Sequence, residues 1–178
     1  PQDAEESKIT AAKFGLHCPF VMQLGSWFPH KNLELTLRGF AESKICREGV
    51  QLVLIGGGAS ESYQQDLHQL VRDLNIGNQI HWIENVISSE LPGLIGASSC
   101  LLQPSRYEGF ALPLLEAMAV GTPGVIADAT CLPEVSAGVW PKVDPDDEEG
   151  WADAMDEMVL QDQARELVIA GGLEHAAG

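Results

Sequence analysis

Hydrophobic residues along this chain gather into short uninterrupted runs, and stretches with helical spacing lie between the runs. We expect buried strands at these runs, the last of which is weaker than the others: 20–24, 51–55, 79–83, 100–103, 124–127 and 138–143. Helices are expected over the remaining stretches: 3–14, 31–42, 62–74, 88–97, 112–120, 146–160 and 161–175. Strands that are apolar on both faces and alternate with helices favour parallel pairing through crossover connections. The pattern therefore predicts an α/β fold with a doubly wound, mostly parallel sheet of about six strands.

The length of 178 residues fits a single domain spanning residues 1–178. The longest apolar run, 111–127, is interrupted by Glu116, Gly121, Pro123 and Gly124, so we expect no transmembrane segment. The chain begins Pro-Gln-Asp-Ala-Glu-Glu, without an initiator methionine or a signal-peptide pattern. We therefore expect an excerpt from a longer protein.

The charge balance is strongly acidic. Ten lysines and arginines face 26 aspartates and glutamates, which gives a formal net charge of −16. Binding to nucleic acid or to an anionic membrane surface needs the opposite sign, so neither is expected. Eleven of the acidic residues lie between Asp144 and Glu174, where Arg165 is the only basic residue. We interpret this segment as a solvated helical face.

The cysteines and histidines predict neither a disulfide framework nor a metal site. Cys18, Cys46, Cys100 and Cys131 are far apart and form no CxxC pair, and the five histidines are scattered. Buried free thiols are typical of a reducing compartment, so we expect a cytoplasmic protein. A full-length parent protein could also bind peripherally to the inner membrane.

The segment after the first predicted strand contains a cation in an unfavourable place. Gly25 and Ser26 leave the strand, and Lys31 stands at the start of the next predicted helix, where a positive charge opposes the helix dipole. An anion shared by Lys31 and the helix amides would explain this placement. The alternative is a solvent-exposed lysine with no ligand.

Two other turns at the same sheet edge are less informative. Gly56, Gly57 and Gly58 could let a ligand approach the backbone, or they could simply form a tight turn, and their spacing matches neither GxGxxG nor a P-loop. Asp128 and Glu134 could each cap a helix or face a site.

The segment after the fourth predicted strand is the most informative. Pro113 suits the first turn of a helix, and the free amides before it could meet a phosphate or a sugar hydroxyl. Glu108 precedes this helix and Glu116 lies about one turn inside it, so two acceptors flank the amides, as the hydroxyls and phosphates of a nucleotide-sugar require. Alternatively, Glu108 is an exposed loop acid and Glu116 a helix-stabilising acid. The helix is nearly apolar all round, which would make a buried Glu116 costly unless it is hydrogen-bonded.

These residues, in this order, resemble the nucleotide-sugar-binding half of the family 4 retaining glycosyltransferases, which have the GT-B fold. The resemblance covers approximately Phe20 to Ala170 and includes an E-x7-E pair, Glu108 and Glu116. The residues that carry it are Gly25, 30–33 (HKNL), 54–58 (LIGGG), 104–105 (PS), 108–118 (EGFALPLLEAM), 121–123 (G-T-P) and 132–135 (LPEV).

The resemblance implies roles for individual residues. Glu108 and Lys31 would be the catalytic residues, with Glu108 beside the donor sugar and Lys31 on the phosphates. Glu116 would bind the ribose hydroxyls, and the turn near Ile83 and Glu84 would hold the base. The remaining implied donor-binding residues are Gly25, Ser26, Arg106, Gly109, Phe110, Ala111 and Leu112. The family needs no metal or other cofactor, because the lysine and a helix N-terminus take the part of a divalent ion.

Two departures from the family pattern affect the expected function. Ser26 stands where many members carry an arginine, so phosphate binding would rest on Lys31 together with Arg106 or backbone amides. The half that binds a glycan or lipid-linked acceptor lies outside this chain, so we expect donor binding without turnover. The alternative is a non-catalytic nucleotide-sugar-binding module. A Rossmann dehydrogenase domain is disfavoured because GxGxxG is absent after the first strand.

Overall fold

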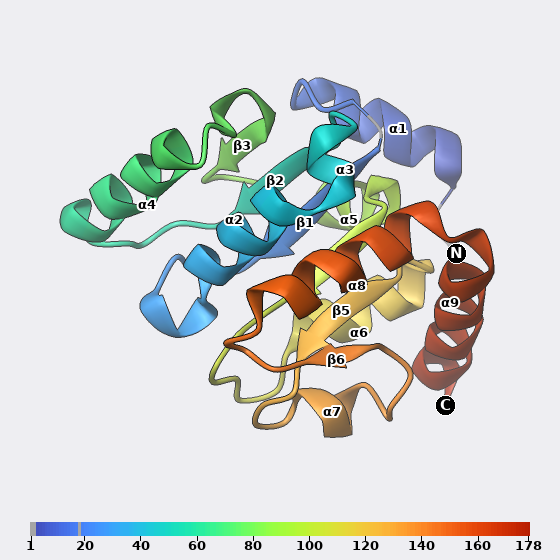
Figure 1. Ribbon diagram of the computed structural model, residues 1–178. Helices are drawn as coiled ribbons and strands as arrows, with labels where there is room; N and C mark the ends of the chain where they lie inside the picture. Colours follow the sequence, from blue (N-terminus) through green and yellow to red (C-terminus); the bar gives the residue numbers. More distant parts are fainter. Residues whose placement is uncertain (1–2, 18) are drawn as a thin grey trace.

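The computed structural model describes residues 3–17 and 19–178. Its centre is a sheet of six parallel strands in the order β3-β2-β1-β4-β5-β6 (Figure 1). The strands are β1 (Phe20–Leu24), β2 (Gln51–Ile55), β3 (Ile80–Ile83), β4 (Cys100–Gln103), β5 (Gly124–Ala127) and β6 (Lys142–Val143). This arrangement confirms the predicted α/β fold with a doubly wound parallel sheet.

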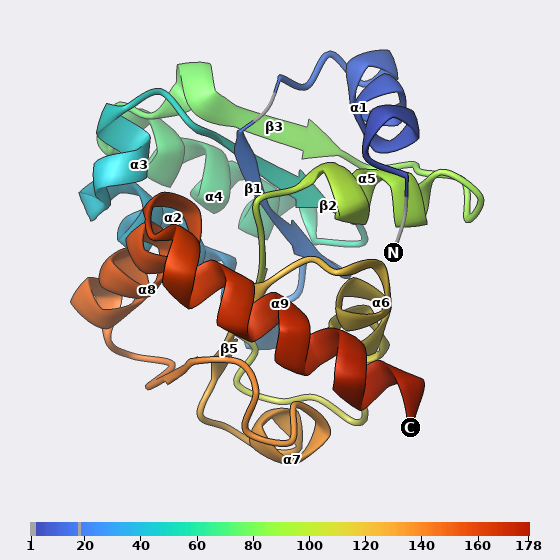
Figure 2. The ribbon, with the colours of Figure 1, turned by 90° about the vertical axis from the view of Figure 1, so that its right-hand side faces the viewer.

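Helices cover both faces of the sheet (Figure 2). Helices α2, α4 and α8 lie on one face, α1, α5 and α6 lie on the other, and α9 runs from α8 across to α6. The helices are α1 (Ala4–Lys13), α2 (Leu33–Glu42), α3 (Lys44–Arg47), α4 (Glu61–Asp73), α5 (Leu91–Ala97), α6 (Leu112–Val120), α7 (Leu132–Val135), α8 (Glu148–Leu160) and α9 (Asp162–Ala177), with 3-10 turns η1 (Pro29–Lys31) and η2 (Gly77–Gln79). Within the described ranges, no helix is both long and apolar enough to cross a membrane.

The strand order reverses at β1, which pairs with β2 on one side and with β4 on the other. The register places Met22 of β1 opposite Val53 of β2 and Leu101 of β4, and all three side chains are buried. The loops that follow β1 and β4 lead to helices on opposite faces of the sheet, and in open α/β sheets ligands bind at such a point, outside the carboxyl ends of the strands. The fold therefore predicts where a ligand would bind before any side chain is considered.

The start of α2 differs from the sequence-based expectation. Asn32 adopts a left-handed conformation with φ 58°, which ends η1 and delays the α-helix to Leu33. The Asn32 side chain is buried, and its Nδ2 donates to the carbonyls of Pro104 (3.2 Å) and Pro145 (2.8 Å). Asn32 thus ties three segments together at the sheet edge. Lys31 consequently belongs to the 3-10 turn and not to the first turn of α2.

The acidic segment contains one structural carboxylate that its sequence did not indicate. Of its eleven acidic residues, eight are exposed and Glu148 and Glu157 are partly exposed, as a solvated face requires. Asp156 is buried, and its two oxygens accept hydrogen bonds from the amides of Lys44 and Ile45, each at 3.0 Å. Asp156 therefore caps the short helix α3 from the neighbouring α8, a long-range contact that periodicity could not predict.

The cysteines that the structure describes are free thiols. Cys46 and Cys100 are buried and Cys131 is partly exposed, whereas Cys18 lies outside the described residues. Burial raises the pKa of the Cys46 thiol and that of the Cys100 thiol. The expectation of buried free thiols is therefore confirmed for Cys46 and Cys100, but Cys131 is more accessible than predicted.

The backbones after β1 and β2 continue side by side at very close range. The amide of Gly25 donates to the carbonyl of Ile55 at 2.9 Å, and the amide of Trp27 donates to the carbonyl of Gly57 at 2.8 Å. A Cβ atom at Gly56 would lie 1.8 Å from the Gly25 carbonyl oxygen, whereas a Cβ at Gly57 would meet nothing within 4 Å. The glycine at position 56 is therefore needed for the approach of two protein backbones, which anchors the loop that leads to Lys31.

We expect Gly56→Ala to lower the free energy of unfolding by about 2–4 kcal/mol, because the Gly25 loop must move to make room for the methyl group. The matched control Gly57→Ala should change it by less than about 0.5 kcal/mol. Denaturant unfolding of both variants checks this, and equal stabilities would contradict the close approach of the two backbones.

Candidate functional site

Two loops at the point where the strand order reverses bring together an ion pair from distant parts of the chain. Lys31 comes from η1 after β1, and Glu108 comes from the loop between β4 and α6. The Lys31 Nζ lies 2.6 Å from the Glu108 Oε1, and the two side chains are only 16% and 10% exposed. The sequence predicts a ligand anion shared by Lys31 and the helix amides, and in this structure the anionic group beside Lys31 is the Glu108 carboxylate.

One oxygen of Glu108 accepts three hydrogen bonds. Its Oε1 receives them from Lys31 Nζ (2.6 Å), Ser105 Oγ (2.7 Å) and Gln103 Nε2 (2.7 Å). Burial by itself would raise the pKa of Glu108, but the hydrogen bonds from these three groups and the charge of Lys31 outweigh it and lower this pKa. Within the described part of the chain, Oε2 has no hydrogen-bond partner, so this oxygen is available to a ligand.

Buried glutamines in the central strands support both members of the pair. Gln23 of β1 donates from Nε2 to the carbonyl of Lys31 at 2.7 Å and accepts a hydrogen bond from Thr36 Oγ1 at 2.6 Å. Gln103, the last residue of β4, donates from Nε2 to Glu108 Oε1. Neither Gln23 nor Gln103 is among the site residues expected from the sequence. A polar side chain within an otherwise apolar buried strand is the signal that would have found them.

The start of α6 presents free amides next to Glu108. Ala111 adopts a left-handed conformation with φ 59°, and no side chain caps this helix. Among the described residues, the amides of Gly109, Phe110, Ala111 and Leu112 have no hydrogen-bond acceptor, and Pro113 has no amide hydrogen. Since the N-terminus of a helix carries partial positive charge, this turn can bind an anion.

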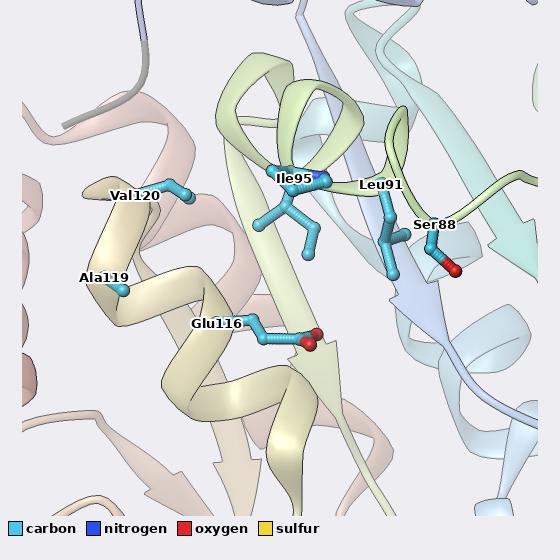
Figure 3. A pocket seen from close by; sticks show the side chains of 7 residues that line it. Ser88, Leu91, Ile95, Glu116, Ala119 and Val120 are labelled. Atoms are coloured by element: carbon cyan, nitrogen blue, oxygen red, sulfur yellow. The ribbon is translucent and has the colours of Figure 1, made fainter.

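Glu116 is exposed, so the expectation that it would be buried in an apolar helix is wrong. Helix α6 turns Leu112, Glu116 and Ala119 outward at helical spacing. Figure 3 shows the Glu116 side chain extending from α6 into a pocket, toward the side formed by Ser88 and Leu91. The pocket has a volume of about 350 Å³ and is lined by Ser88, Leu91, Pro92, Ile95, Glu116, Ala119 and Val120.

The turn expected to hold a base lies near this pocket but does not line it. Ile83 is the last residue of β3, and its carbonyl accepts a hydrogen bond from the amide of Gly56 at 2.9 Å. Glu84 follows it and is exposed. Further along the same connection, Ser88 and Leu91 are the residues that reach the pocket.

Arg106 does not join Lys31 in the structure. Its guanidinium lies 2.5 Å from Asp146, and the side chains are 46% and 71% exposed. The hydrogen bond between the two groups raises the pKa of Arg106 and lowers that of Asp146. Arg106 lines a separate polar hollow beside α2, so the group that could supplement Lys31 on phosphates is the row of free amides rather than Arg106. Ser26 is partly exposed in the loop after β1.

The turn after β5 contributes residues other than the two that the sequence singled out. Asp128 pairs with Lys142 at 3.1 Å, and Glu134 is exposed on α7. Between them, Thr130 and Cys131 contact the main chain of Glu108, which the sequence did not indicate. In the described part of the chain, no group of three or more histidines, cysteines or acidic residues could hold a metal ion.

The family model for glycosyl transferases of group 1 matches residues 8–175. This match covers nearly the whole chain, and the chain belongs to the group 1 glycosyltransferases. O-antigen chain mannosyltransferase B from Escherichia coli is 33% identical over 163 residues, which cover 88% of this chain and 41% of that protein. The chain thus spans about two fifths of the length of the O-antigen mannosyltransferases it matches.

Solved structures support the same assignment at the level of the fold. The C-terminal domain of a group 1 family glycosyl transferase, LpcC from Francisella tularensis, superposes with a TM-score of 0.84 at 22% identity and covers 98% of this chain and 92% of that one. Anabaena Alr3699/HepE, solved in complex with UDP-glucose, gives a TM-score of 0.84 at 18% identity over 99% of this chain and 49% of its own. The domain therefore has the architecture of a GT-B C-terminal half.

We expect Lys31→Met to lower the free energy of unfolding by about 2–3 kcal/mol at pH 7, because it leaves the largely buried Glu108 carboxylate without its counter-charge. Since the folded-state pKa of Glu108 lies below its ordinary value of 4.5, the ion pair contributes fully above that value and is lost as the pH falls through the lowered pKa. The difference between wild type and variant should therefore shrink in acid.

Urea unfolding at several pH values measures this dependence. Lys142→Met is the matched control, because Lys142 pairs with Asp128 on the surface and should contribute less than about 1 kcal/mol. If Lys31→Met lowers the free energy of unfolding equally at pH 7 and in acid, the charge of Glu108 is not the cause of the loss.

Proposed function

We propose that this domain binds the nucleotide-sugar donor of a retaining glycosyltransferase. The observation that carries the proposal is the row formed by the Lys31–Glu108 pair, the free amides at the start of α6, and Glu116 one turn further along that helix. A cation and amides suit a diphosphate, and carboxylates on either side suit the hydroxyls of two sugars. The relative solved with UDP-glucose has the same fold.

In this proposal the diphosphate lies between Lys31 and the amides of Gly109 to Leu112. These groups supply the positive charge that a divalent cation supplies elsewhere, so the donor binds without a metal. The same charge stabilises the diphosphate as it leaves, which lowers the barrier to breaking the bond to the sugar. Glu108 faces the donor sugar with its free Oε2 and accepts a hydrogen bond from a sugar hydroxyl.

The nucleoside occupies the pocket between α5 and α6. Glu116 accepts hydrogen bonds from the ribose hydroxyls, and the apolar side chains of Leu91, Pro92 and Ile95 contact the flat surface of the base. Base selection through main-chain groups of the connection after Ile83 would leave no mark on the side chains.

The transferred sugar goes to a glycan or lipid-linked acceptor held by a part of the full-length protein beyond this domain. This inference is supported by the E. coli relative, a mannosyltransferase of the O-antigen chain of which the present chain spans 41%. The isolated domain should therefore bind donor without transferring sugar. The free thiols of Cys46, Cys100 and Cys131 suit the cytoplasm.

Lys31→Ala should weaken binding of the matching nucleoside diphosphate by about tenfold or more, because it removes a charge-assisted contact, while binding of the nucleoside changes little. Calorimetric titration with UDP, GDP and ADP in EDTA, followed by the corresponding nucleosides, measures this. Lys142→Ala controls for the loss of one positive charge. Equal losses of affinity for the diphosphate and the nucleoside would show that Lys31 does not contact the phosphates.

Glu116→Gln should weaken the ribonucleoside diphosphate several-fold more than its 2′-deoxy counterpart, since a carboxylate accepts a hydroxyl hydrogen bond more strongly than an amide does. Competition binding with the two nucleotides gives the ratio directly. Glu61→Gln, which neutralises an exposed acid on α4, is the control. An unchanged ratio of the two affinities would show that Glu116 does not bind the ribose and has a structural role only.

A further inference from the structure

The main chain of Glu108 is held on both sides by the loop between β5 and α7. The amide of Glu108 donates to Thr130 Oγ1 at 3.2 Å, and the thiol of Cys131 donates to the carbonyl of Glu108 at 3.3 Å. Two consecutive side chains therefore satisfy both polar groups of a single residue 22 and 23 positions away in the chain.

Few other contacts fix this part of the β4–α6 loop. Among the described residues from Arg106 to Phe110, the only other main-chain hydrogen bond is the one from the amide of Arg106 to the carbonyl of His30. Gly109, which follows Glu108, lies in open space and has the widest conformational freedom of any residue. Without Thr130 and Cys131, the main-chain amide and carbonyl of Glu108 would have no hydrogen-bond partner among the described residues.

Thr130 occupies a backbone conformation that disfavours its own side chain. Its φ is 50°, in the left-handed region, where a β-branched residue is strained and a glycine is not. The residue is exposed, so burial of its methyl group does not offset the strain. In the described part of the chain, the hydrogen bond with Glu108 is the only one that its side chain makes. A strained backbone at Thr130, whose side chain makes this one hydrogen bond, points to a role for the contact with Glu108.

We propose that Thr130 and Cys131 are positioning residues for Glu108, which hold its main chain so that Oε1 meets Lys31 and Oε2 faces the donor. The proposal rests on the proposed function for the part that concerns the donor. The part that concerns the carboxylate depends only on contacts within the chain. Because a displacement of about 1 Å at a reacting group can cost two orders of magnitude in rate, a main-chain anchor of this kind matters for catalysis as much as the side-chain contacts do.

The first test follows the Glu108 carboxyl by NMR titration of the ¹³C-labelled chain, with Glu108→Gln to identify its signal. In the double variant Thr130→Gly/Cys131→Ala, the midpoint should move upward toward the ordinary glutamate range, because Glu108 no longer stays in register with Lys31, Ser105 and Gln103. Thr130→Ser combined with native Cys131 keeps both contacts and should restore the wild-type midpoint.

A strain-matched control separates positioning from stability. Ala137 also has a positive φ, 49°, and is exposed, so Ala137→Gly relieves similar backbone strain without touching Glu108. Ala137→Gly should unfold at or above the wild-type temperature and leave the Glu108 titration unchanged, whereas the Thr130 variant should shift the Glu108 midpoint upward. An unchanged midpoint in the double variant overturns the proposal.

The second test compares UDP-glucose with UDP, and GDP-mannose with GDP, by calorimetry. The double variant should lose about three- to tenfold in affinity for the sugar-bearing ligand of the pair that the wild type binds, and less than about twofold for the diphosphate. Equal affinities for variant and wild type would overturn the donor-facing part of the proposal. If the wild type binds none of UDP, GDP and ADP, the proposed function fails, and the NMR titration alone then decides whether Thr130 and Cys131 position Glu108.

Discussion

A charged group that is largely buried needs an oppositely charged partner, and the candidate site is organised around that requirement. Lys31 and Glu108 are each almost covered, and each would be costly without the other. Their pairing fixes how the loop after β1 lies against the loop after β4, and Gln23, Gln103 and Ser105 complete the hydrogen bonds around it. The free amides at the start of α6 follow Glu108 directly in the chain, and Glu116 and its pocket lie further along that helix. The remaining features of the site are therefore arranged around one ion pair at the point where the strand order reverses.

The fold was predictable from the sequence because it depends on a regular signal. Apolar runs mark strands that are covered on both faces, and four of the six strands have the predicted bounds. The short helices α3 and α7 and the 3-10 turns escaped prediction, because each depends on a specific contact rather than on periodicity. Asp156 capping α3 from α8 is the clearest case, since the partners lie more than 110 residues apart in the chain.

The candidate site was only partly predictable. Lys31, Glu108 and Glu116 stand out in the sequence as charges in unexpected places, and the structure gathers the first two and sets the third beside a pocket. Whether Glu116 is buried could not be judged from the composition of α6, because the direction of its exposed face depends on how α5 and α9 pack against it. The roles of Thr130 and Cys131 were invisible for a similar reason, since a hydroxyl or a thiol in a turn gives no indication of which backbone it meets.

The separation of Lys31 and Glu108 along the chain also has a consequence for folding. The two residues are 77 positions apart in the chain. Lys31 follows β1 and Glu108 follows β4, so they meet only when those two strands have paired. Pairings of such long range form late, because chain entropy must be given up before they contribute. A partly folded domain with only β1, β2 and β3 assembled would contain Lys31 and the glycine turns but no Glu108 beside them. Completion of the sheet is thus what assembles the site, and a ligand that needs both residues would select the fully folded molecule.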